Sequence, residues 1–168
     1  MTNLSEYIST CRIVFRENNE FVTKTTNDLF SKKRVVIFGL PGAFTPTCSS
    51  FQLPGFEKEY NEIISQGIDE VYCVSVNDPF VMNAWAKDQG IENVKLIPDG
   101  NAYLTRSLGM TVMKSNLGFG IRSWRYAAVY NDMKLEKDFV EFGMHDNVEE
   151  DPYEVSTPEN ILTYLKGR

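Results

Sequence analysis

The sequence predicts an α/β protein in which a central mixed β-sheet is flanked by helices. Short apolar strands alternate with helical segments through the middle of the chain, and strands in that order pair in parallel. A β-hairpin near the C-terminus adds antiparallel strands, and a final helix follows it. The sequence contains no internal repeat, low-complexity stretch or linker-like region, so we expect a single domain over residues 1–168.

The N-terminal part of the chain is rich in predicted strands. The segment RIVFRENNEFVTKT is typical of two short strands about a turn at Asn18–Asn19. Arg34–Leu40 is β-branched and apolar on both faces, as a central buried strand requires. Residues Ser49–Ser65 carry apolar side chains at helical spacing, and Gly67 is a plausible C-terminal stop.

Strands and helices continue to alternate after this helix. Val71–Val76 is a second buried strand. Asp78 is a predicted N-cap, Pro79 suits the first helical position, and this helix should end near Gly90. The segment VKLIPD follows as a third, shorter strand.

The C-terminal part of the chain predicts a helical turn, a hairpin and a helix. AYLTRSLG is typical of one or two helical turns, and the stretches RSWRYAAVYND and KLEKDFVEF predict a hairpin about Asn131–Asp132. The acidic segment HDNVEEDPYE is interpreted as a solvated loop. Ser156, with Glu159 three residues later, predicts a capping box that opens the last helix.

Composition and charge exclude several classes of function. The 168 residues are 42% hydrophobic, which is ordinary for a globular protein, and the net charge of −6 argues against binding to nucleic acid or anionic membranes. No secretory leader and no apolar run of membrane-spanning length are visible. The odd set of Cys11, Cys48 and Cys73 argues against a disulfide framework and favours the reducing cytoplasm. His145 is the single histidine, so we expect no metal site and no cofactor.

Cys48 stands where a reactive thiol is expected. It follows the Pro- and Gly-rich turn of FGLPGAFTPTCSS and lies in the first turn of the predicted helix, where Pro46 suits the helix start. Free backbone N–H groups, the helix dipole and any cationic neighbour favour an anion at such a position. Thr45, three residues earlier, can face the same small space, and Pro41 and Phe44 can wall it from bulk water. From the spacing alone, an inert buried cysteine explains these residues equally well.

The motif Pro41-x-x-x-Thr45-x-x-Cys48 resembles the active-site motif of peroxiredoxins. The wider stretch PGAFTPTCSS…LPGF, together with CVSVNDPFVMNAW, IPDGNA and LGFGIRSWRYAAVYND, is similar to the atypical subfamily that includes the mammalian type-five and plant type-two enzymes. The resemblance extends from Lys33 to the last helix. It implies a thioredoxin-like fold and the reduction of hydrogen peroxide and alkyl hydroperoxides by a thiol.

The resemblance assigns roles to individual residues. Cys48 is implied to be the peroxidatic nucleophile that becomes a sulfenic acid, with Thr45 hydrogen-bonding the peroxide and Pro41 shielding the sulfur. The active-site arginine of the family matches Arg125, whose charge would stabilise the thiolate and the developing oxygen anion. Arg122 is the alternative candidate for the active-site arginine. It lies three residues earlier and is therefore expected on the opposite face of a strand.

Two positions depart from relatives of this kind. Many relatives have a histidine four residues after the reactive cysteine, whereas this chain has Gln52, which can orient a hydrogen bond but adds no charge. The type-five enzymes have a resolving cysteine near the last helix, where this chain has Val155. Cys73 matches a cysteine that plant relatives keep, but its apolar strand context favours a core role. Cys11 lies outside the matched segments and is interpreted as structural or incidental.

We therefore predict a cycle that uses one cysteine, with the sulfenate reduced by glutathione, through glutaredoxin, and with thioredoxin as the alternative reductant. The resemblance also implies a homodimer, because Phe44 and Phe80 lie in segments that form the dimer contact of the subfamily, although core packing would explain both residues as well.

Two other classes of protein are alternatives to a peroxidase. A thiol–disulfide exchange protein would need a CxxC motif, which is absent, and a non-catalytic redox-signalling or holdase module would not need Thr45 and Arg125.

Overall fold

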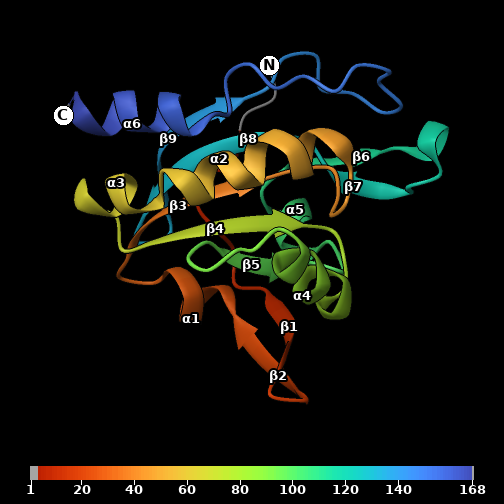
Figure 1. Cartoon of the computed structure of the whole chain (residues 1–168), viewed down its shortest axis with the longest axis horizontal. Helices are drawn as coiled ribbons and strands as arrows, with labels where there is room; N and C mark the ends of the chain where they lie inside the picture. The colour runs from red at the N-terminus through yellow and green to blue at the C-terminus, as the bar shows by residue number, and fades with distance from the viewer. Residues whose placement is uncertain (1–3, 168) are drawn as a thin grey trace.

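The computed structural model describes residues 4–167 of the chain (Figure 1). The strands are β1 (Arg12–Glu17), β2 (Glu20–Thr25), β3 (Arg34–Gly39), β4 (Glu70–Ser75), β5 (Lys95–Pro98), β6 (Thr111–Met113), β7 (Ile121–Ser123), β8 (Tyr126–Asn131) and β9 (Lys134–Val140). The helices are α1 (Thr26–Phe30), α2 (Leu53–Lys58), α3 (Tyr60–Ser65), α4 (Pro79–Asp88), α5 (Tyr103–Ser107) and α6 (Pro158–Lys166), with a π-helical segment η1 (Cys48–Gln52) and a 3₁₀ turn η2 (Ser115–Leu117).

The central sheet is mixed, which confirms the predicted fold class. Its strand order is β5-β4-β3-β8-β9. The pairs β3–β4 and β4–β5 are parallel, whereas β3–β8 and β8–β9 are antiparallel. The parallel strands are joined through helices, and the antiparallel strands come from the C-terminal hairpin, as the alternation of elements in the sequence predicts.

Both faces of the sheet are covered, so the central strands are apolar on both sides. Along β3, Val35 and Ile37 pack into a cluster with α1, α5 and β1, whereas Val36 and Phe38 pack into a cluster with α2, α3, α4 and α6. Figure 1 shows α2, α3 and α6 together on one side of the sheet, with the β1–β2 hairpin projecting at the other end of the molecule. Phe38 stacks on Phe56 of α2, with ring centroids 4.0 Å apart, and this contact ties the helix after the reactive cysteine to the sheet.

The two hairpin turns need backbone in the left-handed region. Asn18 and Asn19 have φ values of 49° and 64°, which confirms the predicted turn between β1 and β2. In the second hairpin the left-handed residues are Asp132 and Met133, one position later than predicted, because β8 continues to Asn131 and pairs it with Lys134. This position is a correction of the predicted turn.

The predicted helix over residues 49–65 is interrupted. Helical backbone begins at Pro46, widens into the π turn η1, and breaks again at Glu59 between α2 and α3. In the π turn, the N–H of Leu53 donates to the carbonyl of Cys48, five residues earlier. Pro54 explains the widening, because its ring has no N–H and crowds the carbonyl four residues before it.

The last helix begins one residue later than predicted. Its N-cap is Thr157, whose side chain accepts a hydrogen bond from the N–H of Asn160, so the capping box of Ser156 and Glu159 is wrong. Ser156 instead donates its hydroxyl to Glu141 at 2.6 Å. No helix among the described residues 4–167 is long and apolar enough to cross a bilayer.

Candidate active site

Cys48 lies at the start of η1, on the face of the helix that packs against the sheet. Its side chain is fully buried in the same hydrophobic cluster as Phe38 and Phe56. The helix around it is fixed from α4, because the indole N–H of Trp85 donates to the Ser49 hydroxyl at 2.9 Å. The inert-cysteine alternative predicts this burial, but it does not predict a charged neighbour.

Arg125 supplies that charged neighbour. It lies between β7 and β8 and is only 1% exposed. Its Nη1 donates to Cys48 Sγ at 3.4 Å and to Gln52 Oε1 at 2.6 Å. Burial by itself would lower the pKa of Arg125, but the charges of Cys48 and Asp151 more than offset this, so its pKa lies above its ordinary value.

Arg122 also lies at the site, which corrects the expectation that it would face the opposite way from Arg125. The predicted strand through both arginines is broken: Arg122 is in β7, which pairs with β6, and Arg125 lies in the connection to β8. Strand alternation therefore does not separate the two side chains. Arg122 Nη1 donates to the Pro41 carbonyl at 3.1 Å and its Nε to the Phe119 carbonyl at 3.3 Å, and within residues 4–167 it forms no hydrogen bond with the sulfur. Burial lowers the pKa of Arg122, and the charge of Cys48 offsets only part of this effect.

The loop before Cys48 is held by polar contacts from neighbouring elements. The N–H of Ala43 donates to the side-chain oxygen of Asn77, just after β4, at 3.0 Å. Thr45 donates its hydroxyl to the Gly42 carbonyl at 2.7 Å, so its hydrogen is committed while its oxygen can still accept. Pro41 is buried. Phe44 is 52% exposed, which corrects the expectation that it walls the site from water.

Gln52 takes part in positioning the guanidinium. Its Oε1 accepts from Arg125, and its Nε2 donates to the Ser156 carbonyl at 3.3 Å. The sequence predicted that Gln52 could orient a hydrogen bond, and this geometry confirms it.

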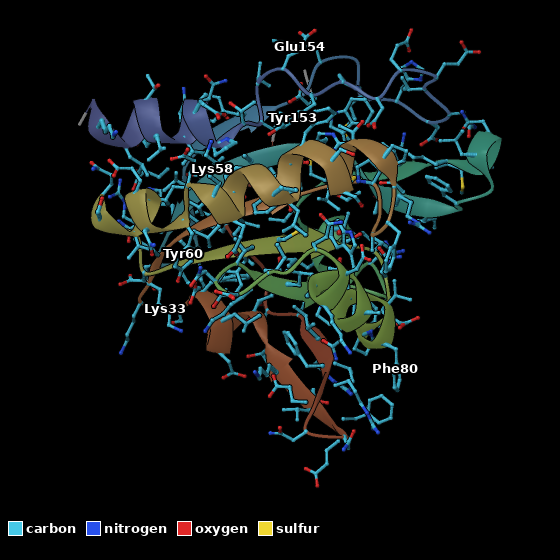
Figure 2. All side chains as sticks on the ribbon, in the orientation of Figure 1. Lys33, Lys58, Tyr60, Phe80, Tyr153 and Glu154 are labelled. Atoms are coloured by element: carbon cyan, nitrogen blue, oxygen red, sulfur yellow. The ribbon has the colours of Figure 1, made fainter. Side chains whose placement is uncertain are left out.

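The loop over residues 145–154 is more than a solvated segment. Asp151 accepts from Arg125 Nη2 at 2.6 Å, and the Pro152 carbonyl accepts from Arg125 Nε at 3.1 Å. Tyr153 follows them above α2, with its ring centroid 5.9 Å from Arg125 Cζ (Figure 2). The sequence interpretation missed Asp151, because a carboxylate in an acidic stretch carries no local sign of a distant partner. His145, by contrast, is exposed and lies away from these contacts, as predicted.

Glu141 anchors this loop to the end of β9. Its carboxylate is 2% exposed and accepts from three backbone N–H groups, those of Glu154, Val155 and Ser156, at 2.7 to 3.0 Å. The Ser156 hydroxyl donates to it as well. A buried carboxylate requires such donors, and these also fix the segment that carries Asp151 and Pro152.

Replacing Glu141 should therefore destabilise the protein. We expect Glu141→Ala to lower the free energy of unfolding by about 3 kcal/mol, because several buried donors lose their acceptor. Denaturant titration would measure the change. Glu154→Ala is the matched control, because Glu154 is exposed and points away from the molecule in Figure 2. Equal stabilities of the two variants would contradict the assigned role of Glu141.

The two remaining cysteines have different environments. Cys73 is fully buried in β4, between Phe38 of β3 and Leu96 of β5, which agrees with a core role. Burial raises the pKa of Cys73 well above its ordinary value, the charge of Cys48 adds to this, and Arg125 opposes it. Cys11 is half-buried next to the backbone carbonyls of Ser9 and Tyr103. All three cysteines are free thiols.

Comparison with known proteins agrees with this site. Residues 13–155 match the Redoxin family. A peroxiredoxin of Rhizobium etli is 63% identical over 144 residues, which cover 86% of this chain and 80% of that protein. Peroxiredoxin-2D of Arabidopsis thaliana is 41% identical over 152 residues, which cover 90% of each chain. The crystal structure of the Plasmodium falciparum antioxidant protein, a 1-Cys peroxiredoxin, has a TM-score of 0.93 at 37% identity and covers 100% of both chains.

A thioredoxin-like α/β fold that places a thiol against a buried guanidinium defines a thiol-dependent oxidoreductase. With these relatives, the chain belongs to the peroxiredoxin family, in the atypical group that includes the plant type-two enzymes. It is a thiol-dependent peroxidase.

Proposed function

We propose that this peroxidase reduces hydrogen peroxide and alkyl hydroperoxides at Cys48 and that glutathione, acting through glutaredoxin, restores the thiol. The observation that carries the proposal is the contact of 3.4 Å between Arg125 Nη1 and Cys48 Sγ. A guanidinium at this distance favours the thiolate, which is the nucleophilic form of cysteine.

In the oxidative step, the Cys48 thiolate attacks the terminal oxygen of the hydroperoxide. The S–O bond forms as the O–O bond breaks, and the leaving alkoxide or hydroxide takes up a proton to give alcohol or water. Cys48 is then a sulfenic acid. Arg125 is proposed to stabilise the negative charge that develops on the leaving oxygen, because its buried guanidinium is already fixed by Gln52 and Asp151.

Thr45 and Pro41 are proposed to complete the peroxide site. Because the Thr45 hydroxyl donates its hydrogen to Gly42, its oxygen is available to accept the hydrogen of the peroxide. Pro41 is buried and has no N–H, so it can exclude water from the sulfur without competing as a donor. Cys48 is fully buried, so a hydroperoxide must displace some of the side chains that cover it.

The reductive steps are proposed to use no second cysteine of this chain. The sulfenic acid and one glutathione give a mixed disulfide and water, and a second thiol then releases Cys48 and forms glutathione disulfide or its glutaredoxin equivalent. The position of Cys73 inside the central strand β4 supports this cycle, because burial raises its pKa and a neutral thiol is a poor nucleophile for exchange. The similar structure from Plasmodium falciparum, which aligns with this chain over its full length, is a 1-Cys peroxiredoxin, and this supports a cycle that uses one cysteine.

Mass spectrometry under non-reducing conditions tests this cycle. After one equivalent of peroxide and one equivalent of glutathione, without glutaredoxin, we expect a glutathione adduct on Cys48. An internal Cys48–Cys73 disulfide would contradict the one-cysteine cycle. Parallel turnover assays with glutathione and glutaredoxin, and with thioredoxin, identify the reductant, and faster turnover with thioredoxin would contradict the glutathione proposal.

We also propose that the protein is a cytoplasmic homodimer with a single domain. Phe80 is 56% exposed and projects from α4 toward the β1–β2 hairpin in Figure 2, where its ring meets that of Phe21 edge-on. The exposure of Phe80 and of Phe44 is inconsistent with core packing and favours an interface. The free thiols support a reducing compartment, and one central sheet shared by both hydrophobic clusters supports a single domain.

A further inference from the structure

Lys114 is a buried cation that the peroxidase mechanism does not use. It follows β6 and is only 3% exposed. Its backbone N–H donates to the Gly120 carbonyl at 2.8 Å. Its Nζ lies 5.9 Å from the ring centroid of Trp124, and among residues 4–167 this Nζ forms no ion pair or hydrogen bond. Lysine is rarely buried unless its charge is paired, and Lys114 has no ion-pair partner among the described residues, so a negatively charged ligand would supply one.

Lys114 lines a cavity next to the loop that carries Cys48. The cavity has a volume of about 90 Å³. Its lining includes Pro41, Thr45 and Pro46 from the loop before Cys48, and the apolar side chains of Leu117 and Phe119. At about 30 Å³ for each water-sized group, this space holds roughly three such groups. A small polar group on a short apolar stem fits both the size of the cavity and its walls.

Three acidic residues, Glu149, Glu150 and Asp151, also line this cavity, but they do not neutralise Lys114. All three are exposed, and none forms an ion pair with Lys114. Asp151 is already engaged by Arg125. Charges in contact with solvent are screened strongly, whereas a buried ammonium acts at short range in a less polar medium.

We propose that Lys114 is a specificity-determining residue that binds a carboxylate of the molecule reacting at Cys48. The carboxylate can belong to the oxidant, as in a hydroperoxide with a terminal acid, or to the reductant, as in the glycyl end of glutathione. The second source rests on the proposed function, whereas the first requires only the peroxidase activity of the family.

The first arm of the test uses a tertiary alkyl hydroperoxide with a terminal carboxylate and its methyl ester. The ratio of kcat/KM for acid over ester is compared in the wild type, in Lys114→Met and in Lys114→Arg. We expect Lys114→Met to lower this ratio about tenfold, because one charge-assisted hydrogen bond is lost. Lys114→Arg keeps the charge and should keep the ratio within about twofold.

The second arm applies the same variants to the reduction of preformed Cys48 sulfenate by glutathione and by its glycyl ethyl ester. A fall of the ratio in one arm supports the proposal and identifies the source of the carboxylate. Unchanged ratios in both arms overturn it, even if all rates decrease together, because a merely structural role affects acid and ester alike. If glutathione fails to reduce the wild type, the proposed reductant is wrong, and the first arm alone decides the role of Lys114. Should Lys114→Met not fold, the wild type must still prefer an acid over its ester in one pair, and no preference in either pair overturns the proposal.

Discussion

Cys48→Ser is expected to abolish hydroperoxide turnover, with a fall of at least about 10³-fold in kcat/KM. A serine hydroxyl is not ionised at neutral pH, so it offers no anion to Arg125 and no nucleophile to the O–O bond. Peroxide consumption with dithiothreitol as reductant measures this loss without depending on the identity of the cellular thiol.

Cys73→Ala and Cys11→Ala are the matched controls for that experiment. Cys73 is a neutral thiol in the core, and Cys11 contacts the carbonyl of Tyr103, the first residue of α5. Both variants should keep most of the wild-type activity. An active Cys48→Ser variant, or a Cys73→Ala variant as inactive as Cys48→Ser, would contradict the assignment of the nucleophile.

Arg125→Met is expected to lower kcat/KM for hydroperoxide by about 10² to 10³-fold. The substitution removes the guanidinium that contacts Cys48 Sγ and that we propose stabilises the developing oxygen anion, and the loss of one such donor typically costs this much. Stopped-flow oxidation of the reduced enzyme measures the effect directly on the peroxide step.

Arg122→Met is the matched control, because it removes an equally large cation three residues away in the same segment. Arg122 holds the Pro41 carbonyl and acts on the sulfur only through its charge, so we expect a loss of about tenfold or less. Equal, small losses in the two variants would remove the catalytic role from Arg125. Circular dichroism of both variants separates a kinetic effect from unfolding, since Arg125 is buried.

Much of the architecture follows from patterns a few residues long. The doubly apolar run at Arg34–Leu40 predicted a central strand, Asn18–Asn19 predicted a tight turn, and Asp78 with Pro79 predicted the start of α4, where the Asp78 side chain accepts from the Val81 N–H. Predictions of this kind depend on backbone geometry and local hydrogen bonds, which neighbouring residues control.

The predictions that were wrong concern contacts between residues distant in the sequence. Ser156 was predicted to cap α6, but its hydroxyl donates a hydrogen bond to the Glu141 carboxylate, and Thr157 caps the helix instead. Arg122 and Arg125 were expected on opposite strand faces, but the chain leaves one sheet and enters another between them. In both cases a partner distant in sequence outcompeted the local preference.

Residue types and their spacing were sufficient to determine the α/β class and the position of Cys48 at a helix start, because strand periodicity and helix geometry act over a few residues. The closure of the Asp151 loop over Arg125, the contact of Arg125 with the sulfur and the burial of Lys114 depended on the packed fold. These contacts join residues far apart in the chain, and their energies exist only after burial has removed water from around the charges.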